Sequence, residues 1–155
     1  MPSKEIVKEL TFGLENLVRV HAQILSFVRL DASEPLKTSA LTYECVGYYN
    51  ALEHLIIRVL KYLQRAMPSG EFSHRDTLRA FEVVLRDFNL GEPVLVSNIE
   101  TLMAFRHVAT KIYGFLIDWE KLKTIINTIQ ANHADFVSIF REIQTQFETE
   151  KQNGD

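Results

Sequence analysis

Apolar residues recur every three or four positions along almost the whole chain, which is the spacing of amphipathic helices. No stretch shows the period-two alternation of a half-buried strand. The predicted helices span residues 4–30, 39–66, 73–88, 97–112 and 119–148. We therefore expect an all-α protein, an up-and-down bundle of about five helices. A single domain is expected over residues 1–149, followed by a frayed polar tail at residues 150–155.

Capping and helix-breaking residues set the predicted limits of these helices. Pro35 indicates a loop between the first and second helices, and the turn at residues 68–70 ends the second. Ser97 begins a capping box that predicts the start of the fourth helix. Gly114 is expected just after the end of that helix, and Asp118 is expected to cap the fifth.

Composition and charge narrow the classes of function. Of the 155 residues, 46% are hydrophobic and 24% are charged, as in ordinary globular proteins. The net charge of −3 excludes a generally basic nucleic-acid binder, so any contact with RNA must be local. No apolar run reaches the ~18 residues of a membrane span, and no signal peptide is expected. The single cysteine, Cys45, excludes an internal disulfide and fits a reducing cytosol, so we expect a cytoplasmic protein.

The predicted fourth helix carries an unusual set of polar side chains. On a continuous helix Arg106, Thr110 and Tyr113 share one face, and His107 and Lys111 form a neighbouring strip. Arginine binds phosphate through two parallel hydrogen bonds, histidine transfers protons near neutral pH, and a tyrosine hydroxyl can accept a transferred group. These residue types indicate RNA or nucleotide chemistry. The alternative is a solvated helix face with a partly buried tyrosine ring.

This stretch resembles the signature of HEPN-domain proteins, in particular the HepT-like group paired with minimal nucleotidyltransferases. The pattern of that group is Arg, four residues, His, one residue and Tyr, and its three positions hold Arg106, Lys111 and Tyr113. The flanking sequence, the turn at residues 68–70 and the following His74 are similar too. The similarity covers about residues 5–147. It implies a HEPN-like bundle that forms a homodimer, with the fourth helices meeting near the two-fold axis.

The resemblance also implies roles for the signature residues. In ribonuclease members the motif Arg and His form a composite site across the dimer and cleave RNA without metal. Here Lys111 stands at the His position, and lysine is a poor general base at neutral pH because it is almost fully protonated there. His107, one turn away, is the candidate replacement, which makes Arg106, Lys111 and His107 the candidate catalytic residues. In HepT-like proteins the motif tyrosine can receive AMP from the partner, which silences the toxin, so Tyr113 is the candidate acceptor.

Two functions remain open at this point. The first is a HepT-like component of a toxin–antitoxin pair, a weakened or inactive metal-independent ribonuclease with Tyr113 as the acceptor of AMP. The second is a non-catalytic helical partner or substrate-binding subunit of a nucleotidyltransferase. Lys111 favours the second, whereas Arg106 and Tyr113 favour a site that is still used. The expected partners are a minimal nucleotidyltransferase, a second copy of the chain and RNA, without membrane, metal or cofactor.

Other polar residues give weaker signals. Glu53 and His54 are adjacent and so lack the Glu-x-x-His spacing of di-iron bundles. Glu71 and His74 have that spacing but no second copy, so we expect no metal site. Glu53 and Arg58, five residues apart on the same helix, could instead line an interface or form a buried pair.

The remaining side chains of interest have structural explanations. His21 and His133 are expected at the surface or in a groove. Cys45 is expected to be a buried thiol, because no histidine or acid accompanies it in a nucleophile motif. No glycine-rich phosphate loop is present, so nucleotide chemistry would depend on a partner.

Overall fold

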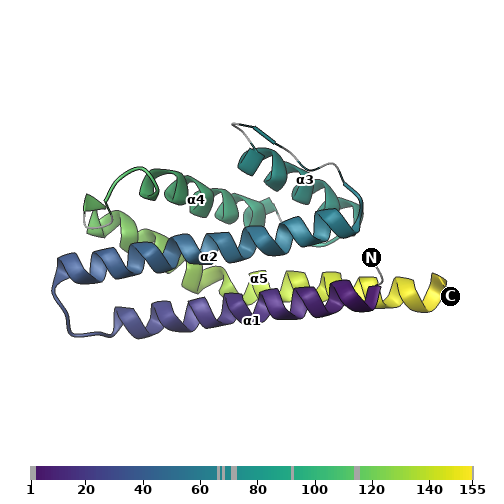
Figure 1. The fold of residues 1–155 in the computed structure, drawn as a ribbon, viewed down its shortest axis with the longest axis horizontal. Coiled ribbons are helices and arrows are strands. Elements are labelled where there is room, and N and C mark those ends of the chain that lie inside the picture. Colours follow the sequence, from purple (N-terminus) through teal and green to yellow (C-terminus); the bar gives the residue numbers. More distant parts are fainter. Residues whose placement is uncertain are drawn as a thin grey trace.

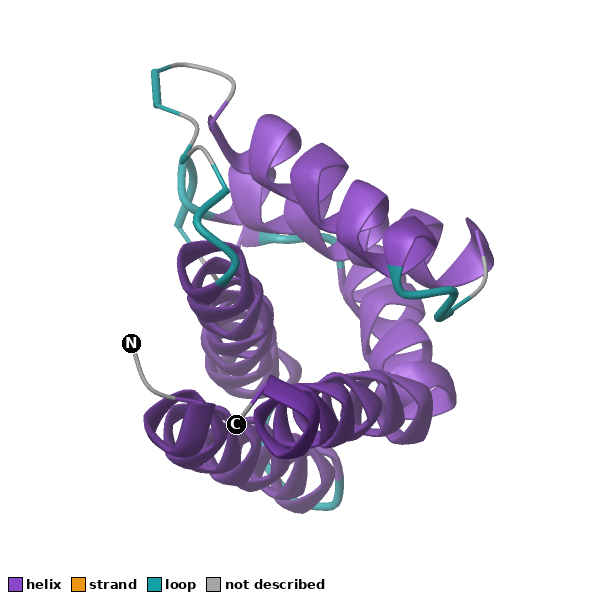
Figure 2. Ribbon diagram, turned by 90° about the vertical axis from the view of Figure 1, so that its right-hand side faces the viewer, coloured by secondary structure: helices purple, strands orange, loops and turns teal. Residues whose placement is uncertain are grey.

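Every regular element in the described part of the chain is a helix (Figure 2). The structure, a computed structural model, describes residues 3–65, 67, 69–70, 73–91, 93–113 and 116–154, the last five of them only as helical backbone. The helices are α1 (Ser3–Val28), α2 (Glu34–Tyr62), α3 (Ser73–Asp87), α4 (Pro93–Ala109) and α5 (Trp119–Gly154). The prediction of an all-α helical bundle is confirmed.

The second helix is the centre of the bundle. α1 and α2 form a long antiparallel hairpin, α5 runs beside α1, and α3 and α4 lie along the other side of α2 (Figure 1). α2 packs against each of the other four helices. Side chains on α2 can therefore meet side chains from α3 and α4, which are far from them in sequence.

One continuous hydrophobic core joins the five helices. Its largest fully buried side chains are aromatic, namely Tyr48, Phe81, Phe136, Phe140 and Phe147. The rings of Phe81 and Phe140 stack with centroids 5.5 Å apart and so link α3 to α5. Burial of such side chains supplies most of the driving force for packing the helices, because each removes a large apolar area from water.

The loop predicted around Pro35 is wrong. α2 begins at Glu34, Ser33 is its N-cap residue, and Pro35 lies in the first turn. The first turn of a helix tolerates proline, because the N–H groups there have no partner within the helix. The predicted loop therefore belongs partly to α2.

The predicted start of α4 at Ser97 is also wrong. α4 begins four residues earlier, at Pro93. As at Pro35, the first turn of the helix tolerates the proline. Ser97 lies inside the helix, where its carbonyl accepts a hydrogen bond from the hydroxyl of Thr101 at 3.2 Å. The expected capping partner Glu100 instead forms an ion pair with Arg79 of α3 at 2.8 Å.

The predicted cap of α5 is confirmed. Asp118 Oδ1 accepts a hydrogen bond from the backbone N–H of Glu120 at 3.1 Å. The helix extends past the predicted end at Glu148 as far as Gly154.

Candidate functional site

The guanidinium of Arg106 is held between α4 and α2. Arg106 is half-buried in the last turn of α4, where a cation interacts favourably with the helix dipole. Its Nε donates a hydrogen bond to Oδ1 of Asn50 on α2 at 2.8 Å. Because Nε is occupied in this way, the edge of the guanidinium that carries Nη1 and Nη2 is the one that can meet an anion.

A histidine from α3 lies beside that edge. Nε2 of His74 is 3.5 Å from Nη1 of Arg106, and its Nδ1 is 2.5 Å from Oε2 of Glu53 on α2. Arginine can only donate, so Nε2 is the acceptor nitrogen. Nδ1 then carries the proton and donates to the carboxylate, which assigns the tautomer of His74 from its hydrogen-bond partners.

The carboxylate of Glu53 has a second donor. The hydroxyl of Tyr49, one turn earlier on α2, donates to the same Oε2 at 2.7 Å. Burial, and after it the hydrogen bond to Glu53, raise the pKa of Tyr49, so this hydroxyl stays protonated and keeps donating. The side chain of Glu53 is 14% exposed and that of His74 is 42% exposed, so the imidazole is the more accessible of the pair.

These residues form one connected polar network, here called the Arg106 cluster. Its members are Tyr49, Asn50, Glu53, His74 and Arg106. The cluster combines a fixed guanidinium, which can bind phosphate, with an imidazole whose Nε2 is next to it, which can transfer a proton. A carboxylate that orients an imidazole through Nδ1 is a common arrangement in acid–base catalysis. The cluster has the parts needed for phosphodiester chemistry without a metal.

The two predicted neighbours of Arg106 lie elsewhere. α4 ends at Ala109, so the prediction of a helix through Ile112 is wrong. The N–H of Lys111 bonds to the carbonyl of Val108 at 3.1 Å, three residues back, which marks a tightened final turn. β-Branched residues just beyond Ala109 have low helix propensity and favour this end. Lys111 is exposed beyond the helix.

His107 is exposed on α4 itself, about 100° around the helix from Arg106. In the part of the chain that the structure describes, the side-chain polar contacts of Arg106 are with Asn50 and His74. His107 and Lys111 are not among them. Their catalytic role stays a prediction.

Tyr113 lies on the exposed connection after α4. Its side chain is 73% exposed, which leaves the ring accessible from outside the bundle. The shared helical face expected for Arg106, Thr110 and Tyr113 is wrong, because only Arg106 lies within α4. Gly114, expected to end the helix, lies outside the described residues.

Sequence reasoning did not identify Tyr49 and Asn50 as site residues. It considered Glu53 as a metal ligand or an ion-pair partner, and His74 as a metal ligand and as part of the family resemblance. Tyr49 and Glu53 are four residues apart, so they share one face of a helix, and that spacing was an available signal. The contact of this face with His74 depends on the packing of α3 on α2, which no local pattern reports. Glu71, which was weighed with His74 as a metal pair, lies outside the described residues.

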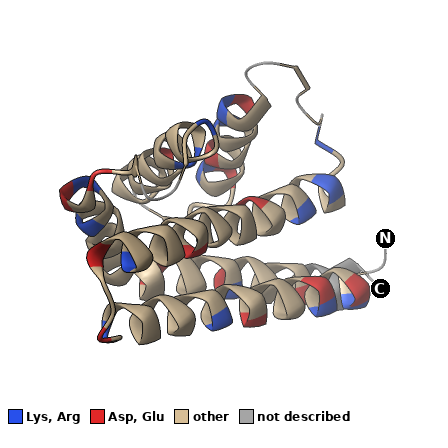
Figure 3. Ribbon diagram, turned by 60° about the vertical axis from the view of Figure 1, so that its left-hand side comes forward, with Lys and Arg blue, Asp and Glu red and all other residues tan. Residues whose placement is uncertain are grey.

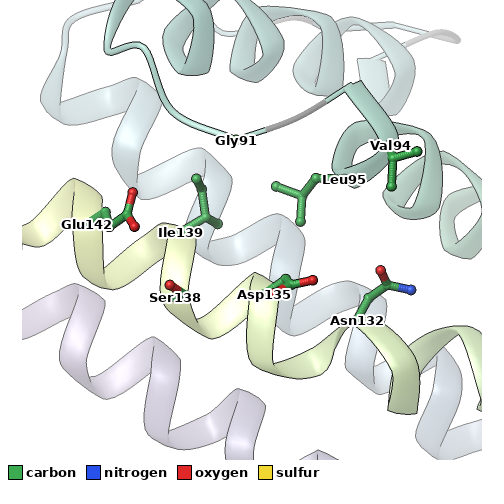
Figure 4. Close-up of a pocket in the computed structure, with 8 residues that line it drawn as sticks. All are labelled: Gly91, Val94, Leu95, Asn132, Asp135, Ser138, Ile139 and Glu142. Atoms are coloured by element: carbon green, nitrogen blue, oxygen red, sulfur yellow. The ribbon is translucent and has the colours of Figure 1, made fainter.

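A pocket between the connection from α3 to α4 and α5 has a different character (Figure 4). Asp135 and Glu142 of α5 lie along it, together with Ser138 and apolar side chains. None of its lining residues is basic. Figure 3 shows acidic and basic residues spread over the same helices, so charge does not gather on one of them. The pocket is therefore unsuited to a phosphate, and the Arg106 cluster remains the candidate site.

Two other kinds of site receive no support. Among the described residues, no group of three His, Cys, Asp or Glu side chains is placed to hold a metal ion. Burial, and then the nearby carboxylate of Glu44, raise the pKa of the Cys45 thiol to about 12. A thiol in that state is not a nucleophile at neutral pH.

None of the described helices contains an apolar stretch long enough to cross a bilayer.

The fold and the Arg106 cluster together define a helical-bundle protein with a candidate anion site between its second, third and fourth helices. The family model of HepT-like proteins matches residues 40–150, which is more than half of the chain. The chain therefore belongs to the HepT-like protein family of the HEPN superfamily. Comparison with curated proteins gives no significant match, and comparison with solved structures gives none either. The matched region includes α4 and every residue of the Arg106 cluster.

Proposed function

We propose that this chain is the RNA-directed component of a toxin–antitoxin pair, a metal-independent ribonuclease of reduced activity whose partner is a minimal nucleotidyltransferase. The observation that carries the proposal is the guanidinium of Arg106, fixed by Asn50 at 2.8 Å with its Nη edge beside an imidazole. A guanidinium fixed in this way can hold a phosphodiester in one orientation. The membership of the chain in the HepT-like family agrees with such a site.

The reaction needs only groups that RNA and the protein supply. The 2′-oxygen attacks the adjacent phosphorus, the new O2′–P bond forms, and the bond from phosphorus to the 5′-oxygen breaks. The products are a 2′,3′-cyclic phosphate and a free 5′-hydroxyl. Arg106 stabilises the negative charge that grows on the phosphoryl oxygens in the transition state. Lys111 at the usual histidine position is the reason to expect a reduced rate.

The partner would act at Tyr113. A tyrosine hydroxyl can attack the α-phosphorus of ATP, which forms a Tyr–AMP ester and releases pyrophosphate. The 73% exposure of Tyr113 leaves it open to a second protein that binds the ATP. Both proteins would meet in the cytoplasm, in keeping with the single buried cysteine.

A homodimer is part of the proposal. Apolar side chains around the end of α4 are exposed, namely those of Val108, Ile112 and Leu116. An exposed apolar group of this kind favours a protein–protein contact. It supports an arrangement in which the fourth helices of two copies meet near the two-fold axis.

A second candidate function is a non-catalytic binding subunit for a nucleotidyltransferase. Lys111 favours this second function. It occupies the position of the motif histidine and lies exposed beyond the end of α4. In that case Arg106 would bind phosphate without cleaving it.

Metal-free cleavage of total cellular RNA tests the proposal. Wild type, Arg106→Ala and Lys111→His would be compared in the presence of a chelator, with Arg141→Ala on α5 as the control for loss of an arginine outside the Arg106 cluster. Removal of one group that stabilises transition-state charge costs about 10²- to 10³-fold in rate, so Arg106→Ala should lose cleavage and Arg141→Ala should keep it.

The possible results separate the two candidate functions. Cleavage that survives Arg106→Ala would overturn the proposal. Silence of wild type, with cleavage gained by Lys111→His, would overturn the proposed ribonuclease activity and leave the second candidate function in its place.

A further inference from the structure

We propose that His74, at the start of α3, is the general base of the Arg106 site, and that Glu53 is the positioning residue that orients it. This inference rests on the proposed ribonuclease function. It assigns proton transfer to a residue outside the signature stretch of α4. It also explains how a chain with lysine at the motif position could retain cleavage.

The imidazole of His74 is held in one direction by its two polar neighbours. Nδ1 of His74 is committed to the carboxylate of Glu53 at 2.5 Å, and the lone pair of Nε2 faces Nη1 of Arg106 at 3.5 Å. That separation is at the limit of a hydrogen bond, so the contact is weak and readily exchanged for one to a ligand. A phosphate bound at the Nη edge of Arg106 would lie within reach of Nε2.

The carboxylate that holds the imidazole is itself fixed in place. Glu53 is 14% exposed, and its Oε2 accepts hydrogen bonds from both His74 and Tyr49. A carboxylate bound by two donors has few alternative positions, so it fixes the rotation and the tautomer of the ring. Tyr49 and Glu53 belong to the central helix, whereas His74 and Arg106 come from helices packed on it. The geometry therefore depends on the packed bundle.

The imidazole of His74 can carry the proton in the proposed reaction. Nε2 takes the proton of the 2′-hydroxyl as the O2′–P bond forms, and the 5′-oxygen leaves with a proton from water. The hydroxide that remains takes the proton from the imidazolium, which restores the neutral ring. Histidine suits this task because imidazole titrates near neutral pH. Lys111 does not suit it, since a lysine is protonated there and cannot accept the proton.

The test measures turnover and binding on one panel of variants. The variants are His74→Ala, His74→Gln and Glu53→Gln, with His54→Ala as the matched control, an exposed histidine next to Glu53 on α2. Cleavage of a defined RNA gives kcat, KM and the pH profile. Affinity for the same sequence with 2′-O-methyl groups, which cannot be cleaved, gives binding alone.

Loss of a general base lowers the rate about 10²- to 10⁴-fold, so both His74 variants should lose kcat by at least about 100-fold while they still bind the 2′-O-methyl RNA. The pH profile of cleavage in these variants should differ from that of wild type. Glu53→Gln should lower kcat more than it changes KM, and it should alter the pH profile. A merely structural role of Glu53 would leave that profile intact. His54→Ala should behave as wild type.

The results distinguish this inference from the proposed function. Cleavage that requires Arg106 but is unaffected by the His74 variants, with an unchanged pH profile, overturns the inference alone. Loss of binding together with cleavage in His74→Gln assigns His74 to the structure of the site and also overturns it. Absence of any cleavage that depends on Arg106 in wild type overturns the proposed function and the inference with it.

Discussion

Tyr113 is the residue at which the proposed partner would act, and its exposure makes a direct prediction. Incubation with the cognate nucleotidyltransferase and ATP should add the mass of AMP to the wild-type chain, because Tyr113 is largely exposed and a tyrosine hydroxyl can accept the group. Tyr113→Phe should abolish the gain. Tyr43 of α2, which is about as exposed as Tyr113, supplies the control. Tyr43→Phe should keep the gain in mass. Intact-mass measurement decides. No added mass, or a gain that persists in Tyr113→Phe, would contradict the prediction.

At the scale of single residues, the sequence identified Arg106 but not its neighbours. An arginine among helical residues is visible in the pattern, because packing alone does not explain it. Asn50 and His74 are 56 and 32 residues away from it along the chain, and they reach it only through the packing of α2, α3 and α4. His107 and Lys111 are close to Arg106 in sequence, yet neither lies beside it. His107 is exposed on another face of α4, and Lys111 lies beyond the end of that helix.

At the scale of helices, the close approach of α1 and α2 depends on Gly13. A Cβ at this position would lie 2.6 Å from Cδ2 of Leu55, a side chain that is fully buried. Leu55 has little room to move, so overpacking should outweigh the gain in helix propensity. We predict that Gly13→Ala lowers the free energy of unfolding by about 1–3 kcal/mol.

Urea denaturation followed by circular dichroism checks this prediction. Gly47→Ala on α2 is the matched control, because a Cβ there would meet nothing within 4 Å. That variant should raise the free energy of unfolding by about 0.5–1 kcal/mol, the usual preference for alanine over glycine inside a helix. An equal gain in both variants would show that α1 and α2 can separate without cost.

The existence of the helices was predictable, but two of their starts were not. Apolar periodicity extends over many residues and is a strong signal, so the number and type of the helices agree with the pattern. Pro35 was expected in a loop and the fourth helix was expected to start only at Ser97, although Pro35 and Pro93 each lie in the first turn of a helix. A proline at a helix start and a proline in a loop leave the same local pattern, and the difference arises from tertiary packing.

At the scale of the whole molecule, α1, α2 and α5 meet at a cluster of rings. His21 of α1 stacks on His133 of α5 with centroids 3.8 Å apart, and Nδ1 of His133 is hydrogen-bonded to the hydroxyl of Tyr48 on α2 at 2.8 Å. No local pattern predicts that these histidines pair, because they are more than a hundred residues apart. Burial, and after it the neighbouring His21, lower the pKa of His133 to about 4.

This cluster makes the stability of the protein depend on pH. The folded pKa of His133 lies below its usual value of 6.5, so the unfolded state takes up a proton first as the pH falls. The contribution of neutral His133 is complete above about pH 6.5 and is lost progressively down to about pH 4. The urea midpoint should therefore fall across this window in wild type.

The measurement compares two neutral replacements. His133→Gln removes the titrating ring and should flatten the decline, whereas His54→Gln, at an exposed position, should leave it unchanged. Because carboxyl groups titrate near the lower end of the window, the informative quantity is the difference between wild type and variant. A parallel decline in wild type and His133→Gln would contradict the prediction.

The attachment of α3 has a consequence for the dynamics of the molecule. α3 is the shortest of the five described helices and packs mainly on α2 and α4, yet it carries one member of the Arg106 cluster. Short peripheral helices open locally at a lower free energy than the core. An anion that bridges His74 and Arg106 favours the closed form by mass action. Hydrogen exchange of the α3 amides and the occupancy of the site would then report one shared equilibrium.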